Sequence, residues 1–167
     1  MELEPRIEIV PPDPTWPDVY DLEAALIKEI LGDRVRLLEH VGSTSVPDLV
    51  AKPIIDMVLA VADSADENSY LPPLEGAGYT VKLREPHWYE HRLLKGPRAD
   101  INLHVFSEGC EEIDNMVRFR DRLRRSAAHR ERYATAKLAL ASKPWKSVQA
   151  YADAKTSVVL AIRDSRD

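Results

Sequence analysis

The segment from Ile54 to Val61 constrains the fold of this chain more than any other part of the sequence. All of its residues are apolar except Asp56. A short, nearly continuous apolar run is typical of a strand that is buried on both faces of its sheet. The sequence therefore predicts a sheet flanked by helices, with one carboxylate inside a buried strand.

Further strands are predicted at residues 35–41, 79–84, 89–94 and 100–106, where apolar residues alternate or cluster between turn residues. A short helix is predicted at residues 71–76, and three helices follow Glu111. The predicted fold class is α/β (α+β), with a mixed sheet and a helical C-terminal third. No linker or change of composition divides the 167 residues, so one domain spanning residues 1–167 is expected.

An amphipathic helix is predicted near the start of the chain. Thr15 and Pro17 mark its first turn, and Gly32 marks its end. Apolar residues recur between them at spacings of three and four, at Val19, Leu22, Leu26 and Ile30. The proline-rich segment before this helix is expected to form an extended arm, with an edge strand at residues 6–10.

The composition excludes several classes of protein. With 44% apolar residues the chain is too rich in core-forming side chains to be disordered. No apolar run is long enough to cross a membrane and no signal peptide is visible, so we expect a cytoplasmic protein without a membrane partner. The net charge of −5 argues against bulk nucleic-acid binding. Because Cys110 is the only cysteine, any metal must use oxygen and nitrogen ligands.

One basic stretch lies within this acidic chain. Between Arg118 and Lys137, basic residues exceed acidic residues by six. A stretch of this kind is commonly the solvated face of a helix, because arginine is a good surface helix former. It is also a candidate partner for phosphate, and the sequence leaves both interpretations open.

A polar turn, Gly42–Ser45, separates two predicted strands. Glycine and small hydroxyl residues allow a phosphate to approach backbone N–H groups, and Lys52 adds a positive charge nearby. An ordinary polar turn is the simpler interpretation. Asp56 begins the next strand, and burying its carboxylate is costly unless it binds a cation or forms a salt bridge, for which Lys52 and Arg92 are candidates.

The predicted strand at residues 100–106 alternates between apolar and polar residues, so that Asp100, Asn102 and His104 share one face. If this strand lies beside the Asp56 strand, His104 or Asp100 converges with Asp56 on one divalent ion. Oxygen and nitrogen ligands of this kind suit Mg²⁺ or Mn²⁺, although histidine is a poor Mg²⁺ ligand. A solvent-facing edge strand is the alternative interpretation.

The segment from His40 to Asp56, HVGSTSVPDLVAKPIID, closely resembles the signature of the GrpB family, within the nucleotidyltransferase superfamily. Other segments are similar to further motifs of that family, and together they cover nearly the whole chain. They are Asp13–Pro17, Ile101–Val105, Phe119–Arg124, and the two Y-x-x-x-K segments Tyr133–Lys137 and Tyr151–Lys155.

The resemblance implies a nucleotidyltransferase-like fold, in which the Gly-Ser turn holds nucleotide phosphates and nearby acids hold a metal. This chain departs from the superfamily pattern at Val58, where a second metal-binding acid is usual. It carries Asn102 at the first histidine of the family's H-x-H strand and retains His104, and Asp48 replaces a glycine after the turn. Members of the family also occur fused to dephospho-coenzyme A kinase, which implies a helper or nucleotide-binding role as much as catalysis.

Two hypotheses follow. In the first, the chain transfers a nucleoside monophosphate from an NTP to an unidentified small acceptor, with pyrophosphate leaving. Asp56 and His104 would be the catalytic residues and the ligands of Mg²⁺ or Mn²⁺, with His104 either a ligand or the general base. The nucleotide-binding residues would be Gly42, Ser43, Thr44, Ser45, Lys52, Tyr133 and Lys137.

The second hypothesis is a non-catalytic nucleotide- or phosphate-binding domain of the same fold, whose metal site is degenerate. A hydrolase built on His40, His91 and His104 finds no support in the spacing of nucleophile and base. The acceptor, the base of the nucleotide and the oligomeric state cannot be read from the sequence.

Overall fold

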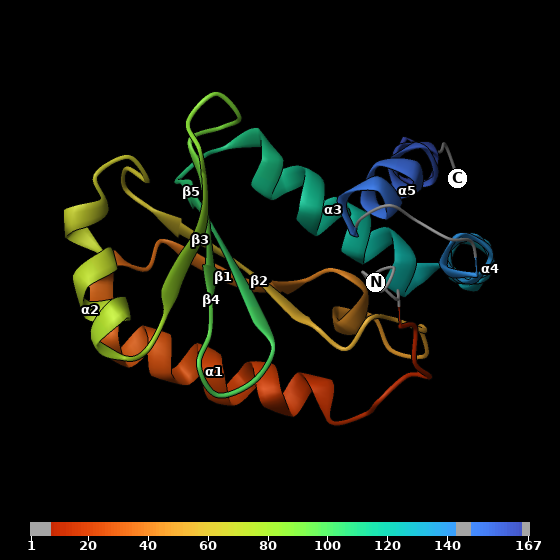
Figure 1. The fold of residues 1–167 in the computed structure, drawn as a ribbon, viewed down its shortest axis with the longest axis horizontal. Helices are drawn as coiled ribbons and strands as arrows, with labels where there is room; N and C mark the ends of the chain where they lie inside the picture. The colour runs from red at the N-terminus through yellow and green to blue at the C-terminus, as the bar shows by residue number, and fades with distance from the viewer. Residues whose placement is uncertain (1–7, 143–147, 165–167) are drawn as a thin grey trace, which may run out of the picture.

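The structure, a computed structural model, describes residues 8–142 and 148–164. Within these residues the chain forms five strands and five α-helices (Figure 1). In chain order they are α1 (Trp16–Leu31), β1 (Leu37–Val41), β2 (Ile55–Val61), α2 (Leu71–Gly76), β3 (Thr80–Glu85), β4 (His91–Lys95), β5 (Ile101–Ser107), α3 (Glu111–Arg125), α4 (Ala127–Ala141) and α5 (Val148–Arg163). Short 3₁₀ turns lie at Gly32–Arg34, Ser43–Ser45 and Glu67–Ser69.

The five strands form one mixed sheet in the order β1-β2-β5-β4-β3. β2 pairs with β1 antiparallel and with β5 parallel, whereas β5–β4 and β4–β3 are antiparallel. The predicted mixed α/β fold is therefore confirmed. The β2–β5 register places Asp56 opposite Asn102, and Val58 opposite His104. The alternative in which residues 100–106 form an edge strand is wrong, because β5 lies between β2 and β4.

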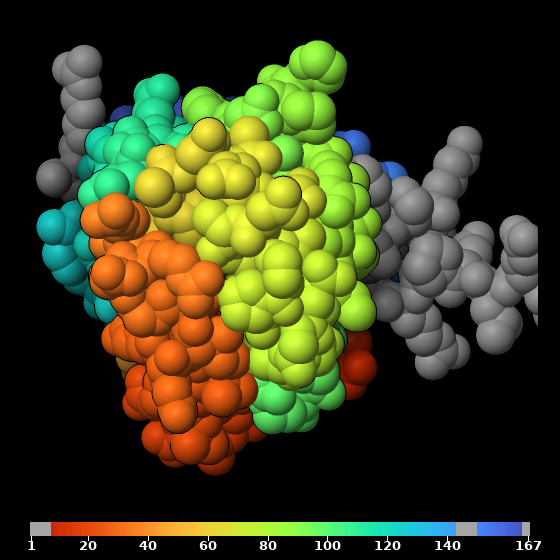
Figure 2. All heavy atoms as spheres, turned by 90° about the vertical axis from the view of Figure 1, so that its left-hand side faces the viewer, coloured from red at the N-terminus to blue at the C-terminus, as the bar shows by residue number. Residues whose placement is uncertain are grey.

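Helices cover both faces of the sheet, and a separate core forms on each face (Figure 1). On one face α1 and α2 pack on Met57 and Leu59 of β2 and on Leu103 of β5. On the other face Val58 packs against Ile113 of α3. Figure 2 looks onto the end of the molecule where α2 lies against the C-terminal part of α1.

A third core joins α3, α4 and α5 to the segment that follows the Ser43–Ser45 turn. It contains Val46 and Leu49 of this segment together with Leu123, Tyr133 and Ile162 of the three helices. The predicted helical C-terminal third is confirmed. This packing brings the C-terminal helices onto the turn, although they are about a hundred residues away in the sequence.

The buried face of α1 agrees with the predicted one only in part: Val19 and Ile30 pack against the core. Ala24, Ile27 and Leu31 are buried, whereas Leu22 is 77% exposed. Glu23 is buried instead, because Arg98 forms an ion pair with its carboxylate and Tyr79 donates a hydrogen bond to it. Paired in this way, a carboxylate can occupy a position that the apolar pattern assigns to the surface.

Two strands begin two residues later than predicted. β4 begins at His91 rather than Tyr89, because Tyr89 and Glu90 both have positive φ in the turn that precedes it. β1 begins at Leu37 rather than Val35. The predicted edge strand at residues 6–10 falls partly outside the described residues, and within them Val10 forms an isolated bridge to Ala51. In the described part of the chain no helix has the length and apolar character of a membrane span.

Candidate functional site

A pocket of about 130 Å³ lies where the Ser43–Ser45 turn, the first residues of β2 and the helices α4 and α5 meet. It is lined by Ser43, Thr44, Lys52, Ile54, Asp56, Asn102, Lys137 and Lys155. The turn directly follows the C-terminal end of β1, and Asp56 pairs with Val41, the last residue of that strand. The structure thus brings together the turn and the carboxylate that the sequence singled out.

Gly42 allows the Asp56 carboxylate to lie directly against the turn. Its φ of +73° and ψ of −177° define a conformation that is essentially restricted to glycine. A Cβ atom at this position would lie 2.7 Å from Asp56 Oδ2, closer than side-chain atoms tolerate. The requirement for glycine therefore comes both from the backbone and from the carboxylate.

The Gly42→Ala substitution is expected to destabilise the protein by about 2–4 kcal/mol, because backbone strain of about 1–3 kcal/mol adds to the clash with Asp56. Urea unfolding of both proteins measures this difference. Gly109→Ala is the matched control, since Gly109 also has positive φ but has open space around it. If both variants lose the same free energy of unfolding, the clash with Asp56 does not contribute to the cost of Gly42→Ala.

Asp56 lies at the end of a row of side chains that crosses the sheet. Its Oδ1 is 3.2 Å from His104 Nε2, His104 Nδ1 is 3.0 Å from His91 Nε2, and His91 Nδ1 is 2.8 Å from Glu85 Oε1. Two neutral imidazoles supply only two N–H groups to these three contacts, so the row is complete only when one ring is protonated. Burial, helped by the neighbouring His104, lowers the pKa of His91.

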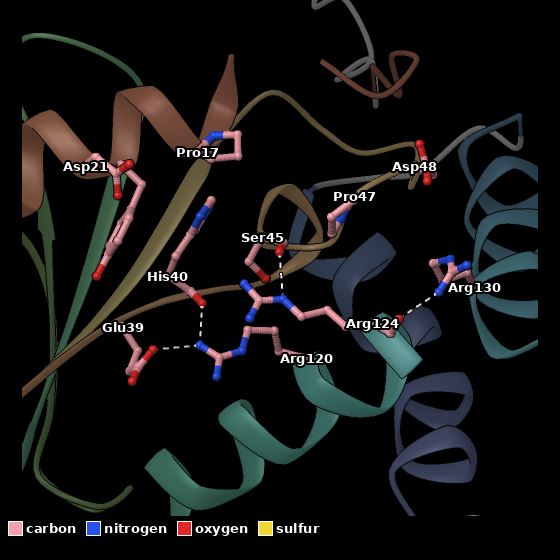
Figure 3. A pocket seen from close by; sticks show the side chains of 11 residues that line it. Pro17, Asp21, Glu39, His40, Ser45, Pro47, Asp48, Arg120, Arg124 and Arg130 are labelled. Carbon is pink, nitrogen blue, oxygen red and sulfur yellow. Dashed lines mark hydrogen bonds and ion pairs between the residues drawn. The ribbon is translucent and has the colours of Figure 1, made fainter. Parts of the chain in front are cut away.

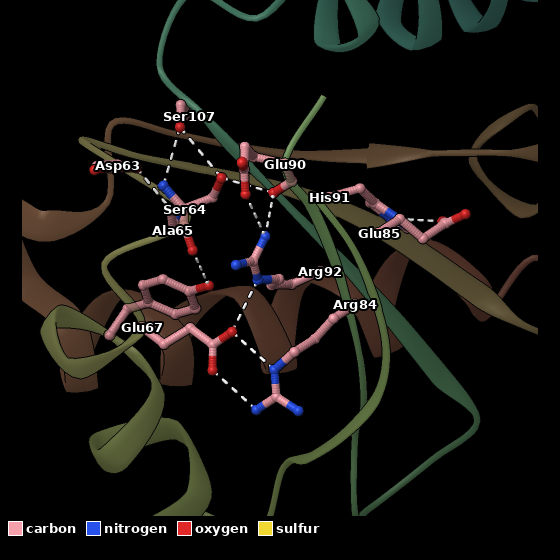
Figure 4. Close-up of polar contacts among 11 residues, drawn as sticks. Asp63, Ser64, Ala65, Glu67, Arg84, Glu85, Glu90, His91, Arg92 and Ser107 are labelled. Atoms are coloured by element: carbon pink, nitrogen blue, oxygen red, sulfur yellow. Dashed lines mark hydrogen bonds and ion pairs between the residues drawn. The ribbon is translucent and has the colours of Figure 1, made fainter. Parts of the chain in front are cut away.

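Neither proposed salt bridge to Asp56 forms. Arg92 is wrong as its partner, because its guanidinium binds Glu67 and Glu90 instead (Figure 4). The Lys52 ammonium forms no ion pair within the described ranges. Asp100, the second acid considered for a metal, pairs with Lys95 at 2.6 Å. Lys95 Nζ also lies 2.6 Å from the Asn102 side-chain oxygen.

Lys137 lies beneath the turn and is only 2% exposed. Its Nζ donates hydrogen bonds to Ser43 Oγ at 2.7 Å and to the Val50 carbonyl at 2.8 Å, and it lies 4.9 Å from the centre of the Tyr133 ring. Burial lowers the pKa of Lys137 to about 7. This residue joins α4 to the turn.

Lys155 adds a third ammonium that was not among the predicted site residues. The Tyr151 ring lies 5.4 Å from Lys155 Nζ and 5.8 Å from Lys52 Nζ, so one aromatic ring contacts both cations. Burial lowers the pKa of both lysines. The signal was present in the sequence, because Tyr151–Lys155 repeats the Y-x-x-x-K spacing of Tyr133–Lys137.

The pocket therefore contains three ammonium groups and one carboxylate, Asp56. Lys52, Lys137 and Lys155 make no ion pair with any carboxylate in the parts of the chain that the structure describes. Bringing like charges together at low exposure is unfavourable unless an anion compensates them. The electrostatics of the pocket thus favour an anionic ligand that carries several charges.

Thr44 and Ser45, two predicted nucleotide-binding residues, are buried, and their hydroxyls bond within the protein. Thr44 Oγ1 donates to the Ile54 carbonyl and contacts His40 Nε2, and Ser45 Oγ donates to the Gly42 carbonyl. These bonds hold the shape of the turn. Ser43 is only partly buried, and its hydroxyl faces the lysines.

His40, considered for the hydrolase alternative, is a buried residue that stacks on Tyr20 with ring centroids 4.9 Å apart. Burial lowers its pKa to about 4. The unfolded chain therefore binds more protons than the folded protein between about pH 4 and 6.5, and stability is lost as the pH falls through this window.

The His40→Gln variant is expected to be less sensitive to acid than the wild type. Each pKa unit corresponds to about 1.4 kcal/mol, so the wild type should lose roughly 3 kcal/mol more than the variant between pH 7 and 4. Urea unfolding across this pH range measures the difference. Parallel pH profiles of the two proteins would exclude His40 as the cause.

The basic stretch does not form one solvated face. Arg120 is only 8% exposed and binds Glu39 and the His40 carbonyl, while Arg124 donates to the Ser45 carbonyl. Lys137 lies in the pocket, and Arg118 and Arg125 are exposed. Arg124 and Arg132 are exposed as well, so the solvated interpretation holds for part of the stretch.

No group of three or more histidine, cysteine, aspartate or glutamate residues in the described part of the chain is placed to hold a metal ion. Asp56 and His104 supply one carboxylate and one imidazole on the same side of the sheet. Such a partial donor set fits a cation that arrives with phosphate oxygens, which is how Mg²⁺ commonly binds in nucleotide sites.

Three comparisons with known proteins extend these observations. A UPF0157 protein of Halalkalibacterium halodurans is 55% identical over 161 residues, which cover 95% of this chain and 83% of that protein. The crystal structure of the conserved protein GrpB from Enterococcus faecalis matches with a TM-score of 0.80 and 29% identity, over 93% of this chain and 97% of that one. A crystal structure of the Cid1 poly(U) polymerase matches with a TM-score of 0.46 and 13% identity, over 78% of this chain and 45% of that one.

The family model described as GrpB protein matches residues 6–165, nearly the whole chain. This match agrees with the motifs gathered at and beside the pocket: the turn after β1, Asp56 on β2 with His104 of β5 next to it, and the two Y-x-x-x-K segments on α4 and α5. The chain belongs to the GrpB protein family.

Proposed function

We propose that the pocket binds the phosphates of a nucleoside triphosphate, and that the chain transfers the nucleoside monophosphate to a small acceptor. The observation that carries this proposal is the group of three ammoniums, Lys52, Lys137 and Lys155, around Ser43 and Asp56. A triphosphate matches three positive charges better than a single phosphate does. The volume of about 130 Å³ suits phosphate groups only, so the nucleoside would extend outside the pocket.

Each residue has a separate task in this reaction. The lysines and the Ser43 hydroxyl bind the β and γ phosphates, and Tyr133 and Tyr151 hold the stems of Lys137 and Lys155 in place. Asp56, with His104 beside it, would hold Mg²⁺ or Mn²⁺, which supplies charge stabilisation to the phosphoryl oxygens. His91 and Glu85 orient His104 from behind. His104 would be either a ligand of that cation or the general base for the acceptor hydroxyl.

A non-catalytic nucleotide-binding domain is the second candidate function, and Val58 favours it. This residue stands two positions after Asp56, where an acid would add a second metal ligand, and it is fully buried in the apolar core with Ile113. The lysines would bind phosphates equally well in such a domain. The two functions therefore differ in turnover rather than in binding.

Release of pyrophosphate distinguishes them. The four NTPs are incubated with the protein, with Mg²⁺ or Mn²⁺, and with the small-molecule fraction of a cell extract as the acceptor pool. We expect release that depends on the protein, on a metal and on the extract. If thermal-shift measurements show NTP binding but no condition gives release, the binding domain is the correct function.

A further inference from the structure

A second and larger cavity, of about 440 Å³, lies on the other side of the Ser43–Ser45 turn from the lysine pocket. Its walls come from α1, from the edge strand β1, from the end of the turn, and from α3 and α4 (Figure 3). The volume falls within the range of small-molecule sites, about 300–1,000 Å³. The function proposed above uses no residue of this cavity.

Two guanidinium groups at one end of the cavity lack carboxylate partners in the described ranges. Arg124 reaches from α3 to the Ser45 carbonyl through Nε at 3.0 Å, which leaves its terminal nitrogens without a hydrogen bond there. Arg130 donates from Nη1 to the Leu123 and Arg124 carbonyls. Burial and the charge of Arg120 lower the pKa of Arg124.

Arg120, the third arginine of the cavity, differs from these two because it has carboxylate partners. Arg120 binds Glu39 at 2.8 Å and Asp121 at 3.0 Å, so its charge is compensated inside the protein. Arg120 therefore has a structural role: its guanidinium anchors α3 to the backbone of β1. Arg124 and Arg130 remain available for a ligand.

The other lining residues limit the chemical class of that ligand. Asp21 of α1 lies at the end of the cavity away from Arg124 (Figure 3), and Asp48 also lines it. These carboxylates disfavour a polyanion such as triphosphate. Pro17, Tyr20 and Pro47 supply an apolar and aromatic wall. Arginine forms strong, directional hydrogen bonds with oxyanions, so a ligand that suits this cavity places a single oxyanion group at the arginine end.

We propose that this cavity binds a small molecule that carries one phosphomonoester or carboxylate group on an apolar body, with the oxyanion held by Arg124 and Arg130. The proposal does not depend on the lysine pocket, because the two cavities share no lining residue.

The probes are phenyl phosphate and benzoate, which carry the two kinds of oxyanion on the same ring. Each is titrated into the ¹⁵N-labelled full chain while the arginine Nε–H resonances are recorded by NMR. We expect the Arg124 and Arg130 resonances to shift together with one Kd, and the Arg118 resonance to stay in place. The probe that binds more tightly identifies the oxyanion class. If neither probe moves Arg124 and Arg130, the proposal is wrong.

Variants locate the site. Arg124→Gln is expected to weaken binding of the better probe at least tenfold, since a charge-assisted hydrogen bond contributes about 1.5–3 kcal/mol. Arg118→Gln, an exposed position on the same helix, should have no effect. Arg124→Lys also loses the Nε–H bond to Ser45 but keeps the positive charge, so it separates the effect of that bond from the effect of the charge. Lys137→Met should leave probe binding unchanged, and loss of binding in this variant instead of Arg124→Gln would overturn the proposal.

Discussion

The Asp56→Asn variant is expected to lose metal-dependent pyrophosphate release by at least about 100-fold, because misplacing one group in a positioned metal site commonly costs that much. The same change should lower the free energy of unfolding only slightly, since the side chain keeps its size and is partly exposed, although the carboxylate compensates the nearby lysines. Pyrophosphate release and urea unfolding measure the two effects separately.

Asp63→Asn is the control, because Asp63 is exposed on the loop after β2 and its side chain accepts a hydrogen bond only from the nearby Ala65 backbone in the described structure. His104→Ala should reduce release by a similar factor but leave NTP binding in place, since the lysines remain. If Asp56→Asn strongly destabilises the protein, and activity falls only in proportion to the folded fraction, the carboxylate has a structural role and no catalytic one.

The Lys137→Met variant is expected to bind NTP at least tenfold more weakly and to unfold at higher urea concentration near pH 7. Binding falls because the ammonium next to Ser43 is lost. Stability rises because a buried charge disappears, and we expect a gain of about 1–3 kcal/mol after the lost bonds to Ser43 and Val50 are subtracted.

The pH dependence of stability tests the same residue. The pKa of Lys137 is about 7 in the folded protein and near 10.5 when the side chain is exposed. The unfolded chain therefore holds more protons between these values, and the unfolding free energy of the wild type should rise with pH across this window. The slope should be smaller in Lys137→Met and unchanged in Lys28→Met, a change at an exposed position on α1. Identical slopes in all three proteins would contradict the buried position of Lys137.

The strands and helices of the fold could be predicted because each depends on local patterns. The apolar run of β2 and the alternation of β5 are visible in the sequence, and both strands form as expected. The sequence did not show that β5 lies between β2 and β4. The pairing of β5 with β2 could only be assumed in order to ask which side chains would then meet. Strand order depends on contacts between distant segments, which no single-sequence pattern records.

The phase of α1 shows why some buried positions were missed. The apolar spacing places Leu22 inside, but the helix turns Glu23 inward because Arg98 and Tyr79 neutralise and bind its carboxylate. These partners lie more than fifty residues away in the sequence. A buried charge of this kind becomes predictable only when its partners are known.

In the candidate site too, some residues could be predicted from the sequence and others could not. Gly42, Ser43 and Asp56 lie close in the sequence around one β-hairpin connection, so their meeting could be predicted from spacing. Lys155 reaches the pocket only because α5 packs on the segment after the turn. The partners of Arg92 and the internal bonds of Thr44 and Ser45 likewise depend on tertiary packing.

The central claim is that the lysine pocket binds the phosphate chain of an NTP, and tripolyphosphate tests it without any assumption about the base. Isothermal titration is carried out with the wild type, Lys137→Met and Lys28→Met, with and without Mg²⁺. We predict saturable binding to one site in the wild type and in Lys28→Met, and affinity at least tenfold weaker in Lys137→Met. Absence of binding to the wild type, or equal affinity in all three proteins, would contradict the claim.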